Sequence, residues 1–384
     1  MTVSTALGSL TTHFSEALSP GLCRTTQAGR QMTSKPVRSN LPRLTGLRAF
    51  AALAVFGFHV SSRWGIFHLP LAYLGYTGVA MFFVLSGFVL AWSTRPGTRA
   101  RTFYRRRFAR IYPAHLTVLL AAAVVPVVQV ARSLPVALPN LFLVQSWSTS
   151  SEYVYGMNGD SWSLSCEMAF YAAFPLAFYF FGRLSNRSRW ALAGAWWAAA
   201  TVIVVFNRAQ GWAYYYPPLQ FGEFVLGMAA AFHLREGRPV RVPLPLALAV
   251  LGAGILVSRK LPYPVPAVAL ALAFVLVIAA AARRDIEAPG GWLGHRWVVY
   301  AGEVSYSFYL VHELTIINVH HLMPGVPGWA QAGTALAVAC MLAVVLHHLV
   351  ERPCRRWLTG SRRSADAVVV APDEQPGPVP ATSP

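Results

Sequence analysis

The stretch from Leu44 to Val60, LTGLRAFAALAVFGFHV, constrains the fold most strongly because it is apolar almost throughout and yet contains an arginine and a histidine. Arg48 and His59 are eleven residues apart, so a helix would place them on nearly the same face, roughly 16 Å apart along its axis. A charge in an apolar span usually faces a protein interior or a water-filled cavity. The stretch therefore predicts a membrane helix that carries part of an active site. The alternative is an arginine that snorkels from a helix end and a histidine at the boundary.

The composition is typical of a polytopic membrane protein. Hydrophobic residues make up 55% of the chain and charged residues only 12%, whereas soluble domains have about 25% charged residues. Ten apolar stretches approach the ~20 residues that cross a bilayer as a helix. They cover residues 44–61, 73–93, 113–131, 162–182, 190–206, 214–233, 243–258, 264–282, 297–320 and 328–350. We expect an all-α fold of about ten transmembrane helices.

The basic residues predict how these helices are oriented. A net charge of +18 would suggest nucleic acid as the partner of a soluble protein. Here most arginines lie in alternate loops, as in the run Arg105–Arg107, and such loops are cytoplasmic under the positive-inside rule. We therefore expect both termini in the cytoplasm, a lipid bilayer around the helices and no nucleic-acid partner.

The two ends of the chain differ from the apolar part. Residues 1–40 are polar and lack the apolar core of a signal peptide, so Met32 is an alternative start. Residues 358–384 are rich in proline and alanine, and both ends are predicted to be disordered cytoplasmic tails around a membrane domain at 41–357. The preference for arginine over lysine, with abundant alanine and valine, indicates a GC-rich genome such as that of an actinobacterium. We therefore expect the protein in the plasma membrane of such a bacterium.

No metal site is expected from the spacing of cysteine and histidine. The cysteines are scattered, and the adjacent histidines lack acidic or cysteine partners at ligand spacing. These residues are Cys23, Cys166, Cys340 and Cys354, and the pairs His320–His321 and His347–His348.

Two arginines follow the second apolar stretch, in the segment TFYRRRFARIYPAH. Arg107 and Arg110 are three residues apart and share a face if the segment is helical. Paired arginines bind phosphate groups through bidentate hydrogen bonds. The pattern therefore predicts a phosphate-bearing ligand, or else a topogenic cluster that touches lipid headgroups.

The fourth stretch opens with the polar sequence DSWSLSCE. Glu167 lies in the first two turns of an otherwise apolar helix, beside Trp162 and Ser163, and Asp160 or Ser161 could cap that helix. An acid there needs a partner, and it could orient a histidine or hold a proton. The alternative is a carboxylate that interacts with the helix dipole.

The ninth stretch carries a polar stripe. Ser305, Tyr309 and His312 are spaced i, i+4, i+7 on an apolar helix, so we expect them to bind substrate. His312 could also be a buried histidine whose hydrogen bonds are satisfied within the protein. Glu351 and Arg352 end the tenth stretch, where Glu351 is a further candidate for substrate binding or for an ion pair near the headgroups.

The chain resembles the acyltransferase-3 family of integral membrane O-acyltransferases through seven segments in the same order. These are LTGLRAFAALAVFGFH, GVAMFFVLSGFVL, RRFARIYP, SWSLSCEMAFYAAFPL, FGEFVLGM, VSYSFYLVH and LVERP. Such enzymes move an acyl group from acyl-CoA to a hydroxyl, commonly on a sugar. The resemblance therefore implies acyl-CoA as a cosubstrate, with no bound cofactor, and a sugar-containing hydroxyl acceptor.

The resemblance also implies roles for single residues. His59 and Arg48 match residues of the first helix that are thought essential in the family. Arg107 and Arg110 match its RxxR pair, which is implicated in donor binding, and Glu167 is the acid of a WSL-x-x-E motif. The matches at His312 and Glu351 are to motifs whose roles are less clear.

The expected chemistry agrees with these matches. A hydroxyl is a poor nucleophile, so an imidazole near neutral pKa can act as its base. We expect His59 to be the base, Glu167 to orient it or to act as a second acid or base, and Arg48 to give electrostatic support. An acyl-thioester relay through Cys166 is less favoured, because no activating base is evident beside it.

The acceptor is open between two classes. A stand-alone domain from a GC-rich genome is similar to the members that acylate sugars or lactone hydroxyls of macrolide antibiotics. The alternative acceptor is cell-surface polysaccharide. A transporter of an acylated glycan is an alternative from another class, although no inverted repeat of interrupted helices is evident. The oligomeric state is left open.

Overall fold

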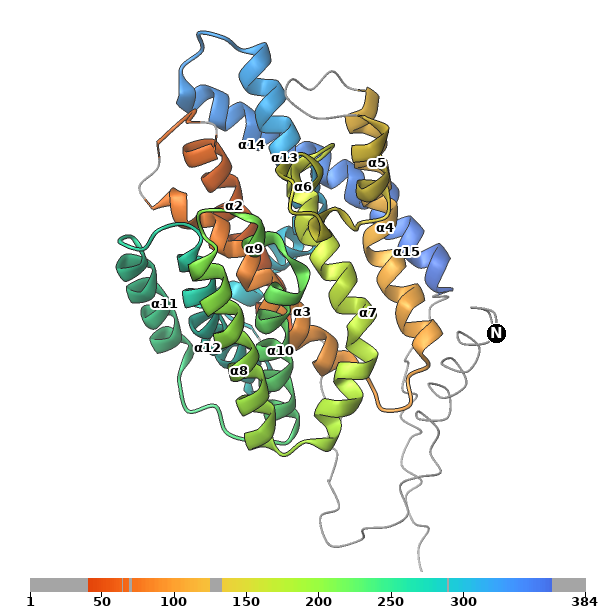
Figure 1. The fold of residues 1–384 in the computed structure, drawn as a ribbon, viewed down its shortest axis with the longest axis vertical. Helices are drawn as coiled ribbons and strands as arrows, with labels where there is room; N and C mark the ends of the chain where they lie inside the picture. Colours follow the sequence, from red (N-terminus) through yellow and green to blue (C-terminus); the bar gives the residue numbers. More distant parts are fainter. Residues whose placement is uncertain (1–40, 64, 69–70, 125–132, 289, 361–384) are drawn as a thin grey trace, which may run out of the picture.

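Helices make up all the regular structure in the part of the chain that the computed structural model describes, which is residues 41–63, 65–68, 71–124, 133–288 and 290–360 (Figure 1). The all-α prediction is confirmed for these ranges. The predicted tail at 1–40 lies outside them, and so does the predicted tail at 358–384 except for residues 358–360, of which 358 and 359 end a helix. The longer helices are α2 (Pro42–Phe58), α3 (Gly78–Ser93), α4 (Ala100–Val124), α7 (Trp162–Arg183), α8 (Asn186–Phe206), α10 (Pro217–Arg235), α11 (Leu244–Ser258), α12 (Val265–Glu287), α13 (Arg296–Leu322) and α14 (Gly328–Leu346).

Short elements connect and extend these helices. The π-helical turns are η2 (His59–Arg63), which continues α2, and η7 (His347–Glu351), which continues α14 into α15 (Arg352–Thr359). The others are η3 (Ala72–Thr77), α5 (Leu134–Leu141), η4 (Gln145–Trp147), α6 (Ser151–Tyr155), η5 (Gly159–Ser161), α9 (Trp212–Tyr215) and η6 (Trp292–Gly294). π-Helical turns are rare and occur frequently at functional sites.

Six helical stretches are long and apolar enough to cross a membrane: Pro42–Ser62, Ala72–Ser93, Gly159–Arg183, Asn186–Phe206, Val265–Glu287 and Gly328–Thr359. The described parts of the other four predicted spans also fall on helices, but α4, α10 and α13 are too polar for this criterion and α11 is shorter. Residues 125–131 of the predicted span at 113–131 lie outside the described residues. The protein is therefore a membrane protein with several spanning helices, whereas the count of ten and the location of the termini stay predictions.

The centre of the bundle depends on close contact between α3 and α10, which pack more extensively than any other pair among the described helices. A Cβ atom at Gly227 would collide with the carbonyl oxygen of Val84, and one at Gly87 would collide with that of Phe224. Small residues at membrane helix interfaces let two backbones approach in this way. On the opposite side, α13 packs between α2 and α14.

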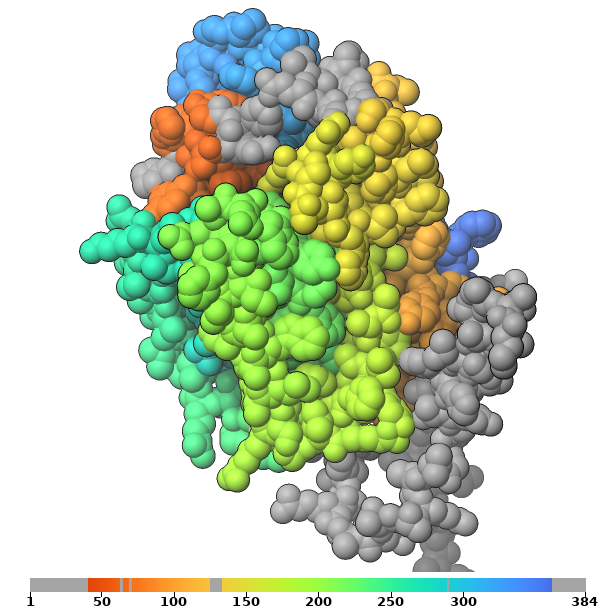
Figure 2. All heavy atoms as spheres, viewed as in Figure 1, coloured from red at the N-terminus to blue at the C-terminus, as the bar shows by residue number. Residues whose placement is uncertain are grey.

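Residues 133–161 cover one end of the bundle (Figures 1 and 2). Buried polar side chains fasten this segment: Gln145 Nε2 donates to the Ser161 carbonyl at 2.9 Å, and Ser146 Oγ donates to the Trp162 carbonyl at 2.8 Å. Asn158 Nδ2 donates to the Leu310 carbonyl on α13 at 2.9 Å. These bonds give buried side-chain amide and hydroxyl groups their partners, and they hold η5 against α7 and α13.

The α3–α10 contact predicts the effect of adding one methyl group. We expect Gly227→Ala to lower the stability of the protein by ~1–3 kcal/mol, because the new Cβ must push the two helices apart. Gly252→Ala on α11 is the matched control, since a Cβ there would meet no atom within 4 Å. Thermal unfolding in detergent measures the difference, and equal melting temperatures for the two variants would contradict the packing described here.

Candidate active site

His59 lies between two carboxylates at the point where α2 becomes a π-helical turn. Its Nε2 is 3.3 Å from Asp160 Oδ1, and its Nδ1 is 3.3 Å from Glu313 Oε1. His59 is 7% exposed, Asp160 3% and Glu313 5%. Charged groups buried to this extent in a membrane protein are costly and mark functional sites.

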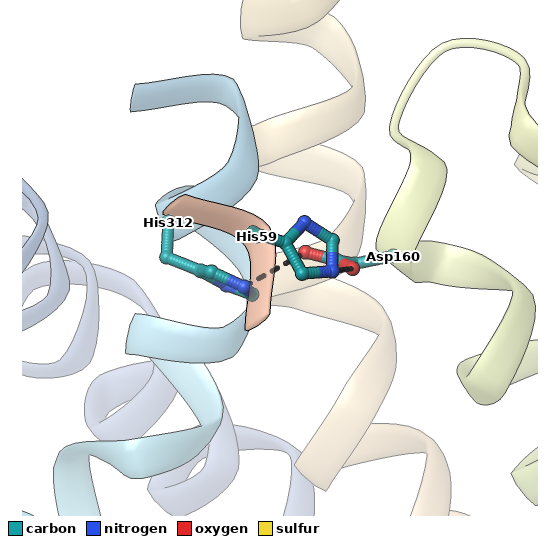
Figure 3. Close-up of side chains that lie close together, drawn as sticks. All are labelled: His59, Asp160 and His312. Carbon is teal, nitrogen blue, oxygen red and sulfur yellow. Dashed lines mark ion pairs between the residues drawn. The ribbon is translucent and has the colours of Figure 1, made fainter. Parts of the chain in front are cut away.

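A second histidine reaches the same aspartate. His312 Nε2 is 3.2 Å from Asp160 Oδ2, and the rings of His59 and His312 are 5.0 Å apart between centroids. Figure 3 shows the Asp160 carboxylate between the two imidazoles, each side chain from a different element: η2, η5 and α13. The fold therefore brings together an Asp and two His residues that are far apart in the sequence.

A cavity of about 330 Å³ opens beside His59. Its polar lining includes His59, Asp160 and Glu313, but no arginine or lysine among the described residues. Aromatic side chains form most of the remaining wall: Tyr76, Tyr155, Trp162, Tyr214, Tyr215, Tyr263 and Tyr309. We call this space the aromatic cavity.

A larger cavity, of about 950 Å³, lies next to it and is lined by arginines. We call it the arginine cavity, after Arg48, Arg106, Arg107, Arg110, Arg355 and Arg356. Its one carboxylate among the described lining residues is Glu167, which accepts a hydrogen bond from the Tyr171 hydroxyl at 3.1 Å. The six cations make this cavity suitable for a ligand with several negative charges.

Tyr309 and Val79 line both cavities and form the wall between them. The hydroxyl of Tyr309 is 2.9 Å from Ser163 Oγ and 3.3 Å from the carbonyl oxygen of Asp160. Ser163 Oγ also donates to that carbonyl, at 3.0 Å. Two hydroxyl groups thus lie at the boundary, next to the backbone of the aspartate that faces His59.

Glu351 fixes the position of Arg110 at the arginine cavity. Its Oε1 is 3.2 Å from Arg110 Nη1, while Oε2 accepts from Ser307 Oγ at 2.9 Å and lies 2.9 Å from His347 Nδ1. Glu351 is 1% exposed and connects the π-helical turn η7 with α4 and α13. An arginine held in this way is preorganised for its ligand.

The structure gathers most of the predicted site residues around the two cavities. Arg48, Glu167, Arg107, Arg110, Ser163 and Ser305 line the arginine cavity, His59 and Trp162 line the aromatic cavity, and Tyr309 lines both. Two candidates for substrate binding line neither cavity: His312 supports Asp160, and Glu351 supports Arg110. The ion pair of Glu351, expected near the lipid headgroups, is instead a buried contact with Arg110 on α4.

Two further expectations differ from the observed geometry. The carboxylates on His59 are Asp160 and Glu313, whereas Glu167, expected to orient His59, shares the arginine cavity with Arg48. Arg48 lies within α2 and His59 lies in η2 beyond its end, and the two line different cavities. Ser161 is the N-cap residue of α7, but its side chain makes no cap hydrogen bond.

Sequence reasoning missed Asp160 and Glu313 as partners of His59. In the sequence Asp160 has the position of a helix cap, and Glu313 directly follows His312 in LVHEL, so each has a local explanation. A signal is present, because Asp160 precedes an apolar helix and Glu313 lies inside a helix between apolar residues, where a carboxylate requires a partner. Cys166 donates to the Tyr215 carbonyl at 3.4 Å and lines neither cavity.

Comparisons with known proteins agree on one family. The acyltransferase-3 family model, described as an acyltransferase domain, matches residues 41–348. Acyltransferase MdmB of Streptomyces mycarofaciens is 37% identical over 377 residues, which cover 88% of this chain and 97% of MdmB.

More distant relatives match a shorter part. Peptidoglycan O-acetyltransferase OatA of Listeria monocytogenes is 28% identical over 161 residues, covering 37% of this chain and 25% of OatA. O-acetyltransferase OatA of Staphylococcus aureus is 30% identical over 161 residues, covering 36% of this chain and 25% of that protein. No solved structure matches this chain.

The contacts of Glu351 predict how much it stabilises the site. We expect Glu351→Gln to lower stability by ~1.5–3 kcal/mol, because it weakens charge-assisted bonds in a buried position. Glu287→Gln is the control: Glu287 pairs with Arg283 at 2.7 Å, but its side chain is 46% exposed, so its loss costs under ~0.5 kcal/mol. Thermal unfolding of both variants tests this, and a larger effect at Glu287 would contradict it.

Proposed function

This chain belongs to the acyltransferase-3 family, and we propose that it moves an acetyl or short acyl group from acyl-CoA to a hydroxyl of a sugar or glycosylated metabolite. Its fold and the similarity to MdmB identify it as a membrane-bound acyltransferase. The donor and the acceptor are the proposed part.

One observation carries the proposal: two cavities of opposite character share a wall. The arginine cavity has six cationic side chains, whereas the aromatic cavity has two carboxylates and an imidazole. A transfer reaction between a polyanionic donor and a neutral or basic acceptor needs a cationic cavity for the donor and a separate cavity without cations for the acceptor. Val79 and Tyr309 mark the place where the two substrates would meet.

The donor occupies the arginine cavity in this proposal. Acyl-CoA carries several phosphate charges, and paired guanidinium groups bind phosphate by bidentate hydrogen bonds. Arg107 and Arg110 lie three residues apart on α4, and Arg355 and Arg356 approach from α15. The apolar side chains of α3 that line the same cavity, including Val79 and Phe83, would contact the acyl end of the donor.

The acceptor hydroxyl is activated by His59. The imidazole takes the hydroxyl proton as the acceptor oxygen forms its bond to the thioester carbonyl carbon. Asp160 and Glu313 stabilise the imidazolium that results, in the way a carboxylate supports a catalytic histidine. When the C–S bond breaks, the same proton passes from His59 to the CoA thiolate, so the products are an ester and free CoA.

The negative charge that develops on the carbonyl oxygen needs hydrogen-bond donors. The hydroxyls of Tyr309 and Ser163 lie at the wall between the cavities, 2.9 Å from each other. In the free protein both hydroxyls point to the Asp160 carbonyl, so one of them would turn its proton to the oxyanion, where a donor in a water-poor site lowers the barrier of acyl transfer. In this proposal Arg48 and Glu167 act on the donor side and do not orient the base.

The aromatic cavity supports a sugar-containing acceptor, because tyrosine and tryptophan rings stack on sugar rings and also suit an amphipathic ligand such as a macrolide. Relatedness to a Streptomyces acyltransferase along nearly the whole chain supports a glycosylated metabolite of an actinobacterium, such as a macrolide, acylated at the plasma membrane. The shorter match to peptidoglycan O-acetyltransferase supports cell-surface polysaccharide as the second candidate.

Acyl transfer in isolated membranes tests the function. Radiolabelled acetyl- and propionyl-CoA are offered with a macrolide and with glycan acceptors. We expect wild type to label one acceptor and His59→Ala to lose ~10²–10⁴-fold in rate, because general base catalysis is removed. Asp160→Asn should lower kcat more than KM, since Asp160 acts on the base.

Two variants serve as controls at equal expression. Glu167→Gln should change the KM for the acyl donor more than Asp160→Asn does. Cys166→Ser should keep its activity, because the mechanism has no acyl-thioester intermediate on Cys166. Full activity of His59→Ala would contradict the mechanism. Absence of labelling on any acceptor, together with movement of a glycan by intact cells, would replace the enzyme with a transporter.

A further inference from the structure

We propose that His59, Asp160 and His312 bind a divalent cation of the zinc class, and that the bound ion inhibits acyl transfer. The binding follows from the geometry of the three side chains alone. The inhibitory effect rests on the proposed function, in which His59 acts as the base.

The distances fit a zinc centre. One ligand atom from each of the three residues lies within 4.8 Å of the other two. The His59 Nε2–Asp160 Oδ1 and His312 Nε2–Asp160 Oδ2 distances are 3.3 and 3.2 Å. Tetrahedral zinc with bonds of ~2.0–2.2 Å separates neighbouring ligand atoms by about 3.3–3.6 Å. Each histidine Nε2 is thus at this separation from one of the two oxygens of Asp160, and the remaining separations, within 4.8 Å, would shorten when an ion binds.

The tautomer of His312 also favours a cation at this place. His312 Nδ1 lies 2.8 Å from the carbonyl oxygen of Tyr309, and because a carbonyl can only accept, Nδ1 carries the proton. In the neutral imidazole Nε2 then has a lone pair, and it faces a carboxylate oxygen at 3.2 Å. Two lone pairs at that distance repel each other, and a positive centre between them removes the repulsion.

Both histidines have the outer partners that metal-binding histidines have. A ligating imidazole usually donates its other N–H to a backbone carbonyl or a carboxylate, which fixes its orientation and raises its basicity. Here the Tyr309 carbonyl accepts from His312, and Glu313 Oε1 is the carboxylate beside His59, 3.3 Å from Nδ1 but outside hydrogen-bond geometry. Both Nε2 atoms are thereby directed at Asp160 (Figure 3).

The donor set selects the type of ion. Two imidazoles and one carboxylate suit zinc, whereas magnesium and calcium prefer oxygen ligands. His59 and Asp160 line the aromatic cavity, so an ion can enter from there and take a water molecule as its fourth ligand. Since the ion occupies the Nε2 lone pair of His59, it competes with the proton that the base must accept.

Titration of the tag-free protein in nanodiscs with Zn²⁺, followed by calorimetry, tests the site. We expect one zinc ion per chain and no binding of Mg²⁺ at equal concentration. His312→Ala should lower the affinity for Zn²⁺ by at least ~10–100-fold, which is the loss caused by removing only an outer partner of a metal ligand. His321→Ala is the matched control, because His321 is an exposed histidine on the same helix. Equal affinity in wild type and His312→Ala would overturn the site, as would absence of binding.

A second measurement on wild type alone guards against a misfolded variant. Co²⁺ bound by the trio should give the intense visible absorption of a tetrahedral site, and Zn²⁺ should displace it; weak octahedral bands would overturn the assignment. In the acyl-transfer assay, Zn²⁺ should inhibit and a chelator should restore the rate. Loss of activity on chelation would overturn the inhibitory role. If the protein showed no acyl transfer at all, the proposed function would fail, and the Zn²⁺ calorimetry and the Co²⁺ spectrum would still test the metal site.

Discussion

A carboxylate held between two imidazoles inside an apolar bundle is the interaction on which the site depends. Asp160 is 3% exposed, and its neighbours His59 and His312 come from η2 and α13. Such a group is costly in a membrane protein unless it is paired. The polar side chains of residues 133–161 hold η5 in place, and the π-helical turn η2 places His59 opposite it. The short helical turns η5 and η2 thus bring Asp160 and His59 together.

The second constraint is the separation of charge between the two cavities. Arginines from α2, α4 and α15 gather in one, and Glu351 holds Arg110 there from the buried side. Carboxylates and aromatic rings form the other. Tyr309 lies between them and touches the Asp160 carbonyl through its hydroxyl, so the place where substrates would meet is coupled to the residue that supports the base.

Much of this arrangement could be predicted from the sequence, because polar residues in apolar helices have few explanations. Arg48, His59, Arg107, Arg110 and Tyr309 all line a cavity. Of the stripe on α13, Ser305 and Tyr309 line the arginine cavity, whereas His312 lines neither. The pairing of these residues could not be predicted. Asp160 lies in a short connecting segment without periodicity, and its approach to His59 depends on tertiary bonds such as that of Asn158 to Leu310. Arg48 and His59 share one helix face, but the cavities on that face are distinct.

The most direct test is a cryo-electron microscopy structure of the protein with a thioether analogue of acyl-CoA, which cannot transfer its acyl group. The account predicts phosphate density against Arg107 and Arg110, and an acyl end that reaches the wall at Val79 and Tyr309, beside His59. Phosphates bound outside the arginine cavity, or an acyl end directed away from Tyr309, would contradict it.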